Sequence, residues 1–156
     1  MKTRIIATVT AAAIAATGIA ATATAQDDLP FPVQARQGQF KLLGLNMGVL
    51  VAMARGEREY DADLAQAAAN NVVTVSRIDQ SFHWPEGTDN MSLVGTLALP
   101  EIWDNLPDVV EKWQAFGSAA EGLAAVAGDG REAMAAQIGP TFDSCNACHD
   151  EYQASE

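Results

Sequence analysis

Apolar residues recur at helical spacing along most of the chain beyond residue 30. Between residues 32 and 56 they repeat every three or four positions, which places them on one face of an amphipathic helix. The stripe consists of Phe40, Leu43, Met47, Leu50 and Ala54. Gly56 predicts the end of this helix, because glycine readily adopts the left-handed conformation of a helix C-terminus.

Residues 61–81 predict a second helix, with Asp61 or Asp63 as its N-cap. The expected inner stripe is Leu64, Ala68, Asn71 or Val72, Val75 and Ile78. A segment rich in turn-forming residues follows and extends to about Leu99, so we expect a long loop there.

The clearest periodicity of the chain begins after Pro100, which occupies a favoured first position of a helix. Apolar residues then alternate at spacings of four and three, as in a coiled-coil seam. They are Ile102, Leu106, Val109, Trp113, Phe116, Ala120, Leu123 and Ala127. Pro107 falls inside this pattern and predicts either a kink or a later start of the helix.

A turn at residues 128–130 precedes the last helical pattern. Its stripe is Met134, Ile138, Phe142, Cys145, His149 and Tyr152, and Gly139-Pro140 predicts an interruption and a bend. Four amphipathic helices with short or moderate connections and no convincing strand predict an all-α antiparallel four-helix bundle.

The first 25 residues have the features of an export signal. Lys2 and Arg4 precede an apolar, alanine-rich stretch, and residues 23–25 form an A-x-A cleavage site before Gln26. A membrane anchor is the alternative, but the stretch is short for a span and contains several threonines. We therefore expect a cleaved signal peptide over residues 1–25, a single domain over residues 26–156, and a periplasmic location without membrane attachment.

The net charge of the chain limits the kinds of partner that it can bind. Without Lys2 and Arg4, seven basic side chains face twenty acidic ones, a formal charge of about −13. Such a surface argues against nucleic acids and anionic membranes. A cationic redox partner or a small neutral ligand fits it better.

Near the C-terminus stands the segment Cys145-Asn146-Ala147-Cys148-His149. The pattern C-x-x-C-H is the attachment signature of c-type haem, in which both thiols bind the haem and the histidine binds its iron. On a helix the three side chains share one face. The alternative is a dithiol motif, which is expected near a βαβ pattern that this sequence lacks. The expected cofactor is one covalent haem c per chain.

The position of this motif limits how the iron is coordinated. Seven residues follow His149, and none is a methionine. A sixth iron ligand must therefore come from an earlier helix, or the position is left empty. His83 is the one spare histidine, and we favour a loop role for it over iron binding.

Several segments together closely resemble the cytochrome c′ family: Ala35-Arg36-Gln37, Trp84-Pro85-Glu86-Gly87, Pro100-Glu101-Ile102-Trp103, and the haem motif extended to Tyr152. The resemblance covers essentially the whole chain after residue 25. Cytochrome c′ is a known up-down-up-down bundle, so this topology is taken from the resemblance.

The resemblance implies roles for further residues. It places Arg36 and Gln37 at the haem propionates, and a guanidinium suits a carboxylate. It places Phe40 over the open face of the iron, where a phenyl ring neither binds iron nor offers a hydrogen bond to dioxygen. It also brings the loop around Met91 near the haem edge. Trp103 and Trp113 are interpreted as packing residues.

One position departs from the family pattern. An arginine commonly stands four residues after the haem histidine, and here that residue is Gln153. A neutral amide in its place alters the electrostatic field near His149.

The favoured function is a periplasmic haem protein with five-coordinate high-spin iron that binds NO or CO, for NO buffering or detoxification. No catalytic acid, base or nucleophile is evident, so the protein is not expected to be an enzyme, although slow NO reduction stays open. One alternative is an electron carrier with six-coordinate low-spin haem, but its candidate ligands Met47 and Met53 look like core residues. Another is a purely structural haem bundle.

The resemblance also implies a homodimer through the first two helices, with Gly48, Ala65, Ala67 and Ala69 as contact candidates.

Overall fold

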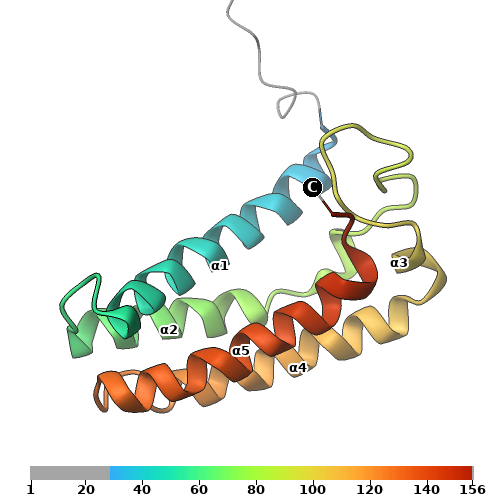
Figure 1. Ribbon diagram of the computed structural model, residues 1–156. Helices are drawn as coiled ribbons and strands as arrows, with labels where there is room; N and C mark the ends of the chain where they lie inside the picture. Colours follow the sequence, from blue (N-terminus) through green and yellow to red (C-terminus); the bar gives the residue numbers. More distant parts are fainter. Residues whose placement is uncertain (1–28, 156) are drawn as a thin grey trace, which may run out of the picture.

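The computed structural model describes residues 29–155, which form a helical bundle (Figure 1). The expected signal peptide lies outside the described residues. The four long helices are α1 (Phe31–Arg55), α2 (Ala62–Ser76), α4 (Leu106–Ala124) and α5 (Arg131–Tyr152). Two short elements, η1 (Gln80–Phe82) and α3 (Glu101–Asp104), lie in the segment between α2 and α4.

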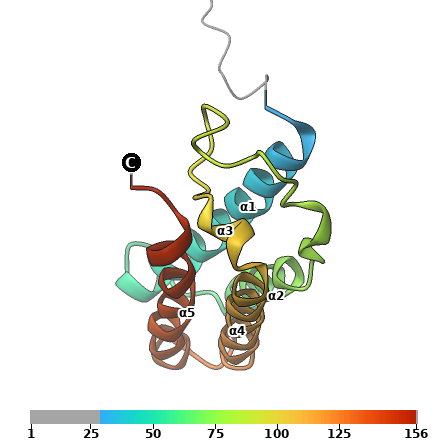
Figure 2. The ribbon, with the colours of Figure 1, turned by 90° about the vertical axis from the view of Figure 1, so that its right-hand side faces the viewer.

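Neighbouring helices contact each other around a ring. α1 packs against α2, α2 against α4, α4 against α5, and α5 returns to α1 (Figure 2). Successive long helices run in opposite directions, so the predicted all-α four-helix bundle is confirmed. Within residues 29–155 the extended backbone pairing is limited to one antiparallel bridge, between Ala98 and Gln153.

The prediction for α1 agrees with the structure to within one residue at each end. Gly56 has φ of 74° and its N–H donates to the Met53 carbonyl at 3.1 Å, which closes the helix as expected.

α2 is shorter than predicted, because it ends at Ser76 instead of continuing to Ser81. Asp79 accepts a hydrogen bond from the Ser81 N–H at 2.8 Å and so starts the η1 turn, which competes with the continuation of the helix. Asp61 is the N-cap, accepting from the Leu64 N–H at 2.9 Å. The predicted inner stripe is wrong at Leu64 and Ile78, which are both exposed, while Ala65 and Ala69 are fully buried.

The third predicted helix is divided at Asn105 into α3 and α4. Pro107 lies in the first turn of α4, where the missing N–H would have no helical partner in any case. The later start predicted from Pro107 is therefore confirmed. The interruption predicted at Pro140 is wrong, since α5 continues through it. Pro140 and Ala136 lie on an exposed side of α5, where water replaces the lost helical hydrogen bond.

The main core occupies the half of the bundle that contains the α1–α2 and α4–α5 turns. Its fully enclosed side chains include Leu50, Met53, Val72, Leu123 and Met134. Tyr60 closes this end: its hydroxyl donates to the Ala127 carbonyl at 2.8 Å and accepts from the Gly130 N–H at 3.0 Å. The opposite end carries the segment 77–105, the start of α1 and the last turns of α5 (Figure 1).

Candidate cofactor site

Cys145, Cys148 and His149 lie in the last two turns of α5. Both cysteines are unpaired and half-buried. Cys145 packs against the main core, whereas Cys148 packs against a smaller cluster of Ile102, Val109 and Tyr152 at the start of α4. His149 is exposed. The three side chains share one face of α5, as the spacing predicted.

Partial burial determines the protonation states of Cys145, Cys148 and His149. Burial raises the pKa of both the Cys145 and Cys148 thiols, and it lowers the pKa of His149. The thiols and the imidazole are therefore neutral around pH 7. Neutral imidazole is the form that donates a lone pair to a metal.

Two aromatic residues lie level with this motif on neighbouring helices. The Phe40 ring on α1 meets Trp113 on α4 edge-on, with 6.2 Å between ring centroids. Trp113 follows Lys112, which is paired with Glu151 of α5, so this contact belongs to the end of the bundle that carries the motif. The indole Nε1 of Trp113 is buried and has no hydrogen-bond partner within the described chain.

Two aromatic residues of the predicted inner stripes, both toward the end that carries the motif, stay partly open to solvent. Phe40 is 37 % exposed and Phe142 is 41 % exposed, although Leu43 and Met47 on the same face of α1 are buried. Large apolar side chains on interior stripes are normally covered. The exposed stripe positions therefore indicate that the protein alone does not fill this end of the bundle.

Arg36 is buried at the same end, with 3 % of its surface exposed. Its guanidinium donates to the His83 and Thr88 carbonyls at 3.1 and 3.0 Å, and to the Thr88 and Thr96 hydroxyls at 3.3 and 3.0 Å. It also lies 4.4 Å from the Trp84 ring centroid. Burial lowers the pKa of Arg36 to about 10, so the side chain remains a cation at neutral pH.

The other predicted contact residues lie in or against the same loop. The Gln37 amide donates to the Gly95 carbonyl at 2.6 Å. Met91 is 82 % exposed, and its N–H donates to Asp89. The propionate contacts of Arg36 and Gln37 and the haem contact of Met91 stay predictions. The structure brings Arg36 and Gln37 together at the loop, while the Met91 side chain points into solvent.

A polar network beside Cys148 was not anticipated from the sequence. The Tyr152 hydroxyl donates to Asp108 at 2.6 Å, and Lys112 lies 3.4 Å from Asp108 and 3.5 Å from Glu151. The hydrogen bond to Asp108 raises the pKa of Tyr152 to about 12. The i,i+4 spacing of Asp108 and Lys112 was visible in the sequence, but their link to Tyr152 depends on how α4 meets α5.

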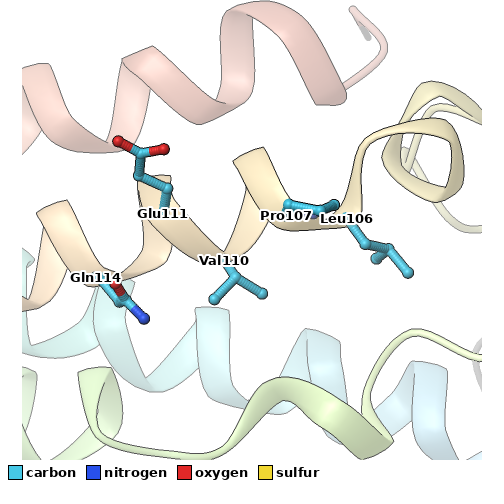
Figure 3. A pocket seen from close by; sticks show the side chains of 5 residues that line it. All are labelled: Leu106, Pro107, Val110, Glu111 and Gln114. Carbon is cyan, nitrogen blue, oxygen red and sulfur yellow. The ribbon is translucent and has the colours of Figure 1, made fainter.

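A shallow surface pocket lies on α4 and is lined by Leu106, Pro107, Val110, Glu111 and Gln114. Leu106 and Val110 point away from α5 (Figure 3). Glu111 points toward α5 in the same view, and all five residues that line the pocket belong to α4.

The residues present fit a covalently bound haem. Two free thiols and a neutral imidazole on one helical face form the donor set of a c-type haem. Phe40, Trp113 and Phe142 offer apolar surface for a flat macrocycle, and the partnerless Trp113 Nε1 adds a donor. Fold and donor set together define an all-helical c-type haem protein.

Comparison with known proteins shows which family of c-type haem proteins this chain resembles. Residues 32–153 match the family model described as Cytochrome C'. The chain is 37 % identical over 126 residues to cytochrome c' of Cereibacter sphaeroides, covering 81 % of this chain and 85 % of the relative. A solved structure of cytochrome c' from Rhodobacter spheriodes has a TM-score of 0.77 at 37 % identity, covering 80 % of this chain and 96 % of that one. A ferrous variant of cytochrome c prime from Alcaligenes xylosoxidans with bound NO has a TM-score of 0.68 at 28 % identity, with coverages of 80 % and 94 %.

The chain belongs to the cytochrome c′ family. Its cofactor is covalent haem c, and the family consists of gas-binding haem carriers that are not typical enzymes. Cytochromes c′ are periplasmic, and some are dimeric. Among residues 29–155, no helix is both long and apolar enough to cross a membrane.

Proposed function

We propose that this protein binds NO and CO at a haem c joined to Cys145 and Cys148, with His149 as the one protein ligand of the iron. Bound haem c supplies an iron atom that takes a diatomic gas at an open coordination position. The observation that carries the proposal is the pairing of Phe40 with Trp113 at the motif end of the bundle. A phenyl ring and an indole offer no lone pair to iron, so these side chains would line the haem site without acting as iron ligands.

The alternative ligands are poorly placed for this role. Met47 and Met53 are buried in the main core cluster, at 6 % and 0 % exposure. His83 lies in the loop after η1, where its carbonyl accepts from Arg36. An iron ligand from any of these residues would require the core or the Arg36 loop to rearrange.

Phe40 also accounts for the expected gas selectivity. An apolar ring excludes water and donates no hydrogen bond, so it disfavours ligands that need a polar partner. NO and CO need no such partner. We infer that NO buffering is the physiological role, and that the relative with bound NO is a useful precedent.

Optical titration of the ferrous protein with CO and with NO tests the proposal. We expect saturable binding of one gas molecule per haem in the wild type and in His83→Ala and Met47→Leu. A wild-type protein that fails to bind CO, together with CO binding restored in either variant, contradicts the proposal and identifies the ligand that blocks the iron.

The proposed domain boundaries can be tested separately. We infer that residues 1–25 direct export to the periplasm and are removed before Gln26. Intact mass and N-terminal sequencing of protein from the periplasmic fraction should give a chain that starts at Gln26 with one haem. A chain retaining its first 25 residues contradicts this inference.

We further infer that a second copy of this chain is its partner. Leu42 and Leu45 on α1 are 52 % and 67 % exposed and lie near exposed Gly48. Ala67 is exposed on α2, whereas Ala65 and Ala69 are buried within the protomer and are unsuitable as contacts. Leu45→Glu should convert a dimer to a monomer in analytical ultracentrifugation; a monomeric wild type contradicts the inference.

The acidic surface suits a cationic redox partner. With about thirteen negative charges in excess, electrostatic steering should accelerate electron transfer with basic proteins. The rate with a basic cytochrome should fall steeply as salt rises, and a rate insensitive to salt contradicts this inference.

A further inference from the structure

Lys112 differs in burial from the other ion-paired cation of the described chain, Arg77. Its side chain is 19 % exposed, against 69 % for Arg77, which pairs with Glu121 at 3.0 Å on the surface between α2 and α4. Exposed pairs are strongly screened by salt, whereas partly buried charges act more strongly on their surroundings. Of the two ion-paired cations among residues 29–155, Lys112 is therefore the more enclosed, and it is the one that joins α4 to α5.

Two interactions connect Lys112 to the last turn of α5. Its ammonium lies 3.5 Å from Glu151, two residues after His149. It also lies 3.4 Å from Asp108, which accepts the 2.6 Å hydrogen bond from Tyr152. Although partial burial acts in the other direction, the two carboxylates hold the pKa of Lys112 above its ordinary value.

The same network touches the haem-attachment turn. Cys148 packs against Tyr152 and Val109, one helical turn from Lys112 on the sequence of α4. Lys112 therefore stands one turn along α4 from a residue that contacts Cys148, and its partner Glu151 stands three residues after Cys148 on α5.

Gln153 does not supply a competing charge at this place. It is the C-cap of α5, with extended backbone (φ −120°, ψ 128°), and it pairs with Ala98 in the antiparallel bridge. Its exposed side chain is neutral. The last turn of α5 thus receives its nearest cation from α4, across the helix–helix contact.

We infer that Lys112 is a positioning residue of the haem site: from α4 it supplies a positive charge beside the turn that carries Cys148, and through Glu151 and Asp108 it fixes the last turn of α5. This inference rests on the haem attachment proposed above. A fixed positive charge stabilises the reduced form of a nearby redox centre, so Lys112 raises the reduction potential of the bound haem.

The test compares Lys112→Met with Arg77→Met in the purified haem-loaded protein. Both variants lose one positive charge from an interhelical ion pair, so their net charges are equal. We expect Lys112→Met to lower the midpoint potential by at least a threefold change in the redox equilibrium, about 28 mV at 59 mV per tenfold change. Arg77→Met should change it by less than half as much, and Lys112→Arg should restore the wild-type value.

Glu151→Gln provides a second variant that leaves the core untouched, because Glu151 is 58 % exposed. Removing this negative charge should raise the potential, opposite in sign to Lys112→Met. Equal shifts in Lys112→Met and Arg77→Met overturn the inference, as does a lowered or unchanged potential in Glu151→Gln. Intact mass separates the two proposals: protein without haem on Cys145 and Cys148 refutes the attachment, whereas attached haem with unchanged potentials refutes only the role of Lys112.

Discussion

The two ends of this bundle are built from the same helices but are packed differently. At the end near the α1–α2 turn, Leu50, Met53 and Leu123 are fully buried, and Tyr60 closes the turns with two hydrogen bonds. At the other end, Phe40 and Phe142 on continuations of the same stripes are more than a third exposed. Side chains alone fill the first end. The second end presents apolar surface, free thiols and an indole N–H without a partner in the described chain.

The difference between the two ends indicates where a cofactor would contribute to the stability of the fold. Apolar surface is stabilising only when it is removed from water. The closed end gains that energy from side chains alone, and we propose that the open end gains it from haem. Variants at the two ends should therefore separate effects on stability from effects on the cofactor.

The largest expected effect is the loss of the cofactor from the open end. In the double variant Cys145→Ser, Cys148→Ser, no covalent haem should form, because serine hydroxyls do not replace the thioether bonds. Intact mass and the haem absorbance after denaturation measure this. A fully haem-loaded double variant after acid–acetone extraction contradicts the assigned attachment.

Truncation at the closed end should have the next largest effect, and on stability alone. Leu123→Ala should lower the free energy of unfolding by about 2–5 kcal/mol, since the side chain is fully buried. In the haem-free double-serine background, Phe142→Ala should cost only about 1 kcal/mol. Chemical denaturation measures both, and equal costs would remove the distinction between the two ends.

Phe40→Ala should act on gas binding more than on folding. We propose that this ring lies over the iron, so opening that space should raise the CO association rate about tenfold, equivalent to about 1.4 kcal/mol of barrier. Flash photolysis measures this rate, with Val51→Ala farther along α1 as the control. An unchanged rate in Phe40→Ala would place the ring away from the gas path.

The smallest expected effect is a pH dependence at the open end, in the last turn of α5. The pKa of Tyr152 is raised to about 12, mainly by the hydrogen bond to Asp108, whereas tyrosine in the unfolded chain titrates near 10. Its stabilising contribution is therefore complete below about pH 10 and is lost as the pH rises toward 12. Tyr152→Phe should flatten the fall in stability over this window in denaturation experiments; an identical fall in both proteins contradicts the assignment.

Much of the fold followed from local patterns. The stripe of α1, the stop at Gly56 and the late start at Pro107 are set by residues within a turn of one another, so the sequence carries them. The end of α2 was missed because the Asp79–Ser81 hydrogen bond competes with a weak helical continuation. Pro140 does not end α5, because the carbonyl that loses its helical hydrogen bond is exposed to water. The free-energy cost of the lost bond is therefore small.

The site was predictable in part for the same reason. The spacing of Cys145, Cys148 and His149 on one helix is local information. The four hydrogen bonds between Arg36 and the loop of residues 83–96 join segments about fifty residues apart, and so does the link from Tyr152 to Asp108. Such contacts depend on helix packing, which no short pattern encodes.

We propose that the open end of the bundle holds a haem whose iron has one protein ligand. The electron paramagnetic resonance spectrum of the purified ferric protein at neutral pH tests it most directly. We expect a high-spin or mixed-spin signal that is the same in the wild type and in His83→Ala. A purely low-spin signal, with the charge-transfer band of a methionine ligand in the optical spectrum, would contradict it.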